Sequence, residues 1–98
     1  MTLKTTAWDV QDSLQTPEDC AAFIRAAIEE AGDDPAFIAA VLGDVARSRG
    51  MAQIARDTGI SREGLYKALS ADGNPSLSTL IKVLGALGLR LHVEAAPA

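Results

Sequence analysis

The sequence predicts an all-α fold, a bundle of about five helices followed by one short C-terminal β-strand. Apolar residues recur at helical spacing through most of the chain, and serine, threonine or aspartate caps, several with a following proline, mark the expected helix starts. Apolar residues make up 48% of the 98 residues but aromatic residues only 4%, a balance typical of closely packed helical proteins. A chain of this length forms one small domain with one core.

We expect three parts: an N-terminal arm over residues 1–15, a single helical domain over residues 16–94, and a tail over residues 95–98. The arm lacks helical periodicity, and Trp8 is its best candidate for an anchor on the body. The first helix should start at the Thr16 cap and end at Gly32. The residues expected on its buried face are Cys20, Phe23, Ile24, Ala27 and Ile28. A single cysteine on that face is interpreted as a small buried hydrophobe rather than a reactive thiol.

The second helix should start at residues 33–35, where two acids and a proline provide a cap and a first turn. Two arginines, Arg47 and Arg49, and then Gly50 mark its end, with cations at the negative end of the helix dipole. The apolar stripe expected along it comprises Phe37, Ile38, Val41, Leu42 and Val45.

The stretch 51–70, MAQIARDTGISREGLYKALS, predicts two short helices joined by a tight turn. Small Ala55 lets the helices approach, and Gly59 supplies the left-handed residue that ends the first helix. Ser61 caps the second helix, whose inner face carries Leu65 and Leu69 together with Ala68.

The outer face of this second helix carries long side chains that can form hydrogen bonds, as a helix in the DNA major groove requires. We therefore interpret residues 51–70 as a DNA-binding helix-turn-helix. The expected DNA-binding residues are Gln53, Ser61, Arg62, Glu63, Tyr66 and Lys67. The alternative is a plain corner between two helices, with Glu63 and Lys67 as a surface pair. Glycine inside a helix costs about 1 kcal/mol relative to alanine, so Gly64 either allows close approach to DNA or is merely tolerated.

After a turn cluster at residues 71–75, Ser76 should cap a last helix that ends at Gly88. Its expected apolar side comprises Leu77, Leu80, Ile81, Leu84 and Leu87. Residues 89–94 then alternate apolar and polar, which predicts a half-buried strand. The sequence offers no second strand, so this one should pair with a second copy or another protein; the alternative is an extended tail packed on the body. For a homodimer, the expected contact residues are Leu84, Leu87, Leu89, Leu91 and Val93.

Charge is divided unevenly within the net −4. Residues 1–46 hold two cations against nine acids, a balance of −7, whereas residues 47–98 hold seven cations against four acids, a balance of +3. The basic excess begins just before the expected DNA-binding element. It is modest, so one copy should bind DNA weakly. The acidic half should face solvent or a basic protein partner.

Catalytic chemistry finds no support in the sequence. There is one histidine and one cysteine, no nucleophile–base–acid set and no phosphate-binding glycine loop. We therefore expect no enzyme, cofactor or metal site; His92 has no second ligand nearby. The sequence shows no signal peptide and no apolar run long enough to span a bilayer, so we expect a cytoplasmic protein.

Several segments together resemble a known family. The helix-turn-helix followed by GNPS and LIKVLGALGL resembles lambda-repressor-like (Xre/Cro) DNA-binding domains. Adding LQTPEDCAAFIRAAIEEAGDD and VLGDVARSRG makes residues 8–94 resemble the HigA-type addiction-module antidotes. The resemblance implies an antitoxin that neutralises a RelE/HigB-like toxin encoded beside it and represses its own operon. The alternative is a stand-alone phage-type repressor, and the acidic N-terminal half favours the antitoxin because such toxins are basic.

Overall fold

The computed structural model describes residues 14–97, which form five α-helices and no β-strand. The helices are α2 (Pro17–Ala31), α3 (Pro35–Arg49), α4 (Met51–Thr58), α5 (Arg62–Ala68) and α6 (Leu77–Ala86). This confirms the all-α class and the helix count for the described part of the chain. Most of the expected arm, including Trp8, lies outside the described residues; Leu14, near its end, is buried.

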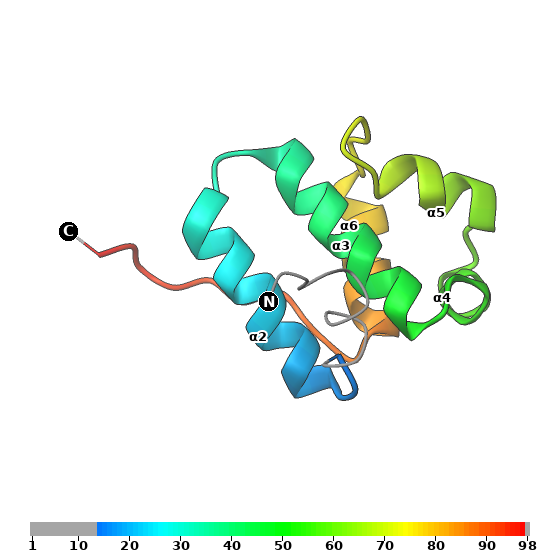
Figure 1. Ribbon diagram of the computed structural model, residues 1–98, viewed down its shortest axis with the longest axis horizontal. Helices are drawn as coiled ribbons and strands as arrows, with labels where there is room; N and C mark the ends of the chain where they lie inside the picture. Colours follow the sequence, from blue (N-terminus) through cyan, green and yellow to red (C-terminus); the bar gives the residue numbers. More distant parts are fainter. Residues whose placement is uncertain (1–13, 98) are drawn as a thin grey trace, which may run out of the picture.

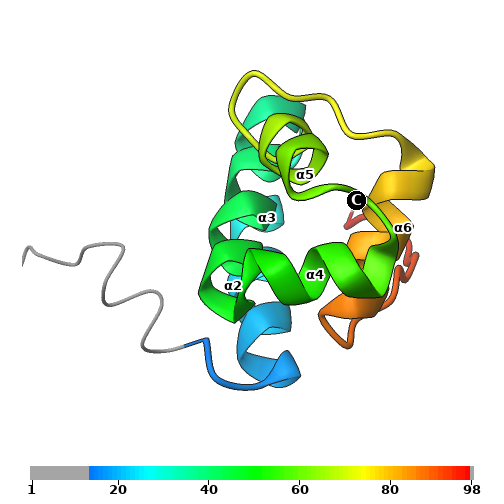
Figure 2. The same cartoon turned by 90° about the vertical axis from the view of Figure 1, so that its right-hand side faces the viewer.

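Helix α3 is the centre of the molecule. It contacts α2 on one side and α4 and α5 on the other, and α4 contacts α6 as well. Figure 1 shows α2 and the α4–α5 pair at opposite sides of α3, and Figure 2 shows α4 crossing below α5. Every helix contributes to one core, which comprises Leu14, Cys20, Ile24, Ala27, Val41, Leu42, Val45, Ala46, Met51, Ile54, Leu65, Leu69, Val83, Leu84 and Leu87.

The helix starts follow the caps that the sequence predicts. The Thr16 hydroxyl accepts a hydrogen bond from the Asp19 amide at 3.1 Å, and the Asp19 carboxylate accepts one from the Thr16 amide at 3.3 Å. This reciprocal pair is a capping box. The Asp34 carboxylate caps α3 by accepting from Phe37, and the Ser76 hydroxyl caps α6 by accepting from Thr79. Short-range signals therefore set where these helices begin.

Three expected apolar faces, those of α2, α3 and α6, differ in the structure. Ile28 and Phe37 are exposed rather than buried, and so are Leu77 and Ile81 on α6. The buried face of α6 is instead centred on Val83, Leu84 and Leu87. The helical period locates an apolar face only approximately, and the position of the neighbouring helices decides which residues at its edges are covered.

Helix α6 ends in a Schellman motif, and the chain then leaves as an extended segment. Gly88 has a φ of 80°, and the amide of Leu89 donates to the carbonyl of Leu84 at 2.8 Å, as this motif requires. Residues 89–94 are the predicted strand, but they carry no strand in the structure. A strand is defined by hydrogen bonds to a neighbouring strand, and the described part of this chain provides none. The segment runs beside α2 instead (Figure 1).

Candidate nucleic-acid interface

Helices α4 and α5 are joined by a three-residue turn, residues 59–61, with a hydrogen-bonded cap at each side. Gly59 has a φ of 76°, and its amide donates to the carbonyl of Ala55 at 2.9 Å. The hydroxyl of Thr58 accepts from the amide of Ile60 at 3.2 Å. The hydroxyl of Ser61 accepts from the amide of Gly64 at 3.0 Å. The predicted roles of Gly59 as the left-handed end of α4 and of Ser61 as the cap of α5 are therefore confirmed.

The inner face of α5 is fixed by apolar packing. Leu65 and Leu69 are both fully buried. Gly43 of α3 lies directly beneath: a Cβ added there would stand 2.1 Å from the carbonyl oxygen of Leu69. Only glycine allows the two backbones to approach this closely. The role of Gly43 was not predicted from the sequence, although a glycine within the apolar stripe of α3 was the available signal.

All six predicted DNA-binding residues are exposed. Five of them lie on α5 or its cap, within one continuous stretch: Ser61, Arg62, Glu63, Tyr66 and Lys67. The sixth, Gln53, lies on α4 and takes part in a chain of hydrogen bonds along that helix. Its amide nitrogen donates to Asp57 at 2.9 Å, and its amide oxygen accepts from Arg56 at 2.7 Å. Arg56 is therefore a further exposed cation of this surface.

The cations of this region differ in what they bind. Arg47 pairs with Asp44, and Arg49 donates to the carbonyl of Gln15 at 2.8 Å. Within residues 14–97, Arg62 and Lys67 make neither a side-chain hydrogen bond nor an ion pair. Glu63 and Lys67 likewise form no pair there, so the surface pair of the plain-corner alternative is absent from this structure. The two cations on α5 are available for an external anion.

Other chemistry is poorly supported in the described residues. Burial raises the pKa of the Cys20 thiol, which the nearby Arg49 only partly offsets, so the thiol stays protonated and unreactive. No group of three or more histidine, cysteine, aspartate or glutamate residues gathers in the described chain as a metal site would require. None of the helices from α2 to α6 is long and apolar enough to cross a membrane.

Comparisons with known proteins place the chain in a family. A protein of Haemophilus influenzae, described as an uncharacterized protein, is 46% identical over 94 residues, which cover 96% of this chain and 95% of the relative. No solved structure matches. A family model described as "Probable addiction module antidote protein" matches residues 4–95. The chain therefore belongs to the family of probable addiction module antidote proteins.

Proposed function

We propose that this protein is a DNA-binding antitoxin that neutralises a RelE/HigB-like toxin and represses the operon encoding both. Family membership supports the antidote role, and it implies a toxin partner and a non-enzymatic function in general. The DNA-binding part rests on one observation: α5 leaves Arg62, Tyr66 and Lys67 exposed while Leu65 and Leu69 are buried in the core.

In this proposal α4 and α5 form a lambda-repressor-like helix-turn-helix, and α5 enters the major groove. Arg62 lies in the first turn of α5, where it can bind a guanine edge or a phosphate. Lys67 contacts the phosphate backbone of the DNA, and Tyr66 packs on the edge of a deoxyribose or on a thymine methyl group. Ser61 and Gln53 bind phosphate near the helix starts. Because Gln53 is bonded to Asp57 and Arg56, its phosphate contact requires exchange of one of those bonds.

The test is binding to the protein's own promoter DNA as a function of salt. Arg62→Ala should weaken specific binding by about 1–3 kcal/mol if this arginine reads a guanine. Lys67→Ala should weaken binding to all sequences and lower the salt slope by about one unit. Lys82→Ala is the matched control, because Lys82 is an exposed cation on α6, outside the α4–α5 pair. If the double variant Arg62→Ala/Lys67→Ala binds as wild type does, α5 is not the recognition helix.

The toxin should dock on the acidic side of the molecule, away from α5. Glu30 and Asp33 are exposed at the α2–α3 corner, where they would attract a basic protein. Reversing both to lysine should slow toxin association and leave operator binding unchanged. Asp34 is left intact because it caps α3, and a reversal there would also weaken the helix. Unchanged toxin neutralisation by the Glu30→Lys/Asp33→Lys variant would mean that this corner is only a solvated surface.

The second candidate, a stand-alone repressor of the same fold, predicts the same DNA results but no toxin capture. Co-expression with the neighbouring reading frame separates the two. A small basic product that copurifies with this chain supports the antitoxin. If no neighbouring product binds, the stand-alone repressor is favoured.

A further inference from the structure

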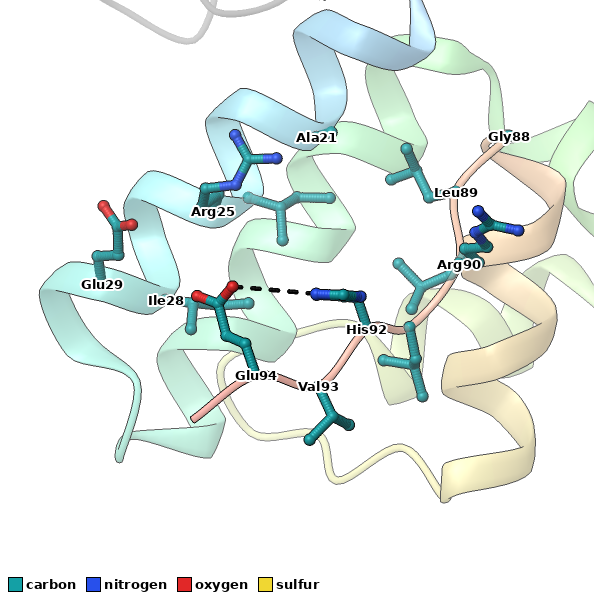
Figure 3. A pocket seen from close by; sticks show the side chains of 13 residues that line it. Ala21, Arg25, Ile28, Glu29, Gly88, Leu89, Arg90, His92, Val93 and Glu94 are labelled. Atoms are coloured by element: carbon teal, nitrogen blue, oxygen red, sulfur yellow. Dashed lines mark ion pairs between the residues drawn. The ribbon is translucent and has the colours of Figure 1, made fainter. Parts of the chain in front are cut away.

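A groove of about 760 Å³ runs between α2 and the segment 88–94. Figure 3 shows α2 forming one wall and the C-terminal segment the other. Ile24 and Ile28 line it from α2, and Leu84 lines it from α6. Leu91 and Val93 of the segment also line it, although they are 51% and 90% exposed. Large apolar side chains left in solvent beside a groove indicate an interaction surface.

The segment has the properties of an unpaired strand. Within the described chain, residues 90–94 make no backbone hydrogen bond. The side chains of His92 and Glu94 lie on the same side, with 3.9 Å between His92 Nε2 and Glu94 Oε1 (Figure 3). Residues two apart share a side only in extended backbone. Free amides and carbonyls in an extended segment are a template for a second strand.

We propose that the groove is filled by the same segment of a second copy, running antiparallel, with His92 opposite the partner subunit's His92. In this register Arg90 lies opposite the partner subunit's Glu94, and Glu94 lies opposite the partner subunit's Arg90. On the other face, Leu91 lies opposite the partner subunit's Val93. The arrangement therefore gives two opposite-charge pairs and two apolar pairs across one two-fold axis. A shift by one residue would place apolar residues opposite polar ones.

The charges on α2 support the same orientation. Figure 3 shows α2 and the segment running in the same direction, with Ala21 toward Gly88 and Glu29 toward Glu94. An antiparallel copy in the groove would therefore bring its Arg90 toward Glu29 and its Glu94 toward Arg25. Arg25, Glu29 and Arg90 have no ion pair within residues 14–97. The copy supplies a partner of opposite charge for each of them.

Burial of Leu84 and Leu87 reduces the set of residues that can form the expected dimer contact. Leu84 and Leu87 are only 7% and 2% exposed, because they pack in the chain's own core. Leu89 is half-buried against that core. Of the five residues expected at the dimer contact, Leu91 and Val93 are the two whose side chains are exposed enough to contact a second copy. A dimer would present two recognition helices to two DNA half-sites. This role in DNA binding rests on the proposed function, whereas the dimer itself does not.

Disulfide trapping tests the register in the free protein, without DNA or toxin. Opposed residues of antiparallel strands have Cα atoms about 4.5–5.5 Å apart, within the range that a disulfide bridges. His92→Cys should therefore cross-link to itself under mild oxidation. Arg90→Cys should not, because four residues of strand separate the two copies of position 90 by roughly 13 Å. A mixture of Arg90→Cys and Glu94→Cys proteins should form the mixed dimer. Wild type is the control, because its Cys20 is buried.

A charge exchange then tests the pairs. Arg90→Glu and Glu94→Arg alone should each raise the dimer dissociation constant by about tenfold or more, since each sets like charges opposite each other twice. The double variant should regain part of this loss. Adding Arg25→Glu and Glu29→Arg should regain more, because α2 then matches the exchanged strand.

Sedimentation gives the dissociation constants. The proposal is overturned if wild type stays monomeric at about 100 μM, as it would if the groove serves the toxin alone. It is equally overturned if Arg90→Cys cross-links as readily as His92→Cys, or if the charge exchange restores nothing. None of these outcomes depends on DNA binding or on toxin neutralisation, so this proposal and the proposed function can fail separately.

Discussion

The α4–α5 pair and the groove beside α2 differ in where their structural information lies. In the α4–α5 pair, Gly59 ends one helix and Ser61 begins the next through bonds to residues no more than four positions away. In the groove, residues 89–94 have a clear strand pattern yet form no strand. A cap is satisfied within its own helix, whereas a strand needs a neighbour that the described part of the chain does not contain.

A local sequence pattern determines only part of the structure of a segment. Alternation of apolar and polar residues reports which conformation suits a segment, but the hydrogen bonds that fix that conformation come from elsewhere. The α4–α5 pair should therefore be stable in the isolated chain, and the C-terminal segment should depend on its partner. Matched substitutions in the two regions test this contrast.

The largest expected contrast is between two leucine-to-alanine substitutions. Leu65 is fully buried, so Leu65→Ala should lower the free energy of unfolding by about 2–5 kcal/mol. Leu91 is half exposed, so Leu91→Ala should lower it by under about 1 kcal/mol at low protein concentration. Urea denaturation of both variants gives the two values. Equal losses in dilute protein would show that the C-terminal segment belongs to the core.

A pair of glycine substitutions tests the contact between α3 and the end of α5. Gly43→Ala places a Cβ against the Leu69 carbonyl and should lower the free energy of unfolding by about 1–3 kcal/mol. Gly85, inside α6, has nothing within 4 Å of an added Cβ, so Gly85→Ala should raise it by up to about 1 kcal/mol through helix propensity. Thermal denaturation should move the two midpoints in opposite directions. If Gly43→Ala instead raises the free energy of unfolding, the space between α3 and α5 can accommodate a methyl group.

Features of the fold that depend on nearby residues could be predicted from the sequence, whereas features that depend on distant residues could not. Thr16, Asp34, Ser61 and Ser76 were all found as caps because each acts on an amide three residues away. Gly43 was missed because its role depends on a residue 26 positions later. For the candidate site, the sequence predicted which residues of 61–67 are exposed. It could not predict the bonds that occupy Gln53, because they depend on the rotamers of its neighbours.

A smaller effect is expected from removing the cap of α5. Ser61→Ala deletes the oxygen that accepts from the Gly64 amide, and loss of such a cap typically costs about 1 kcal/mol. Ser78→Ala is the control, since Ser78 is an exposed serine within α6 for which the described chain shows no side-chain hydrogen bond. Amide hydrogen exchange should increase in the first turn of α5 for Ser61→Ala alone. Equal exchange in both variants would mean that packing, not capping, fixes the start of α5.

The smallest expected effect concerns Gly64, where two local forces oppose each other. Alanine there should gain up to about 1 kcal/mol of helix propensity. Its Cβ, however, would stand 3.1 Å from the Ser61 hydroxyl oxygen and 3.4 Å from Ile60 Cγ2, which crowds the capping bond. Gly64→Ala should therefore change the free energy of unfolding little in wild type but raise it clearly in a Ser61→Ala background, where the hydroxyl is gone. A double-mutant cycle measures this coupling. A coupling of zero would mean that the cap does not require glycine at position 64. Binding of the Gly64→Ala protein to promoter DNA would then show whether close approach to DNA requires this glycine.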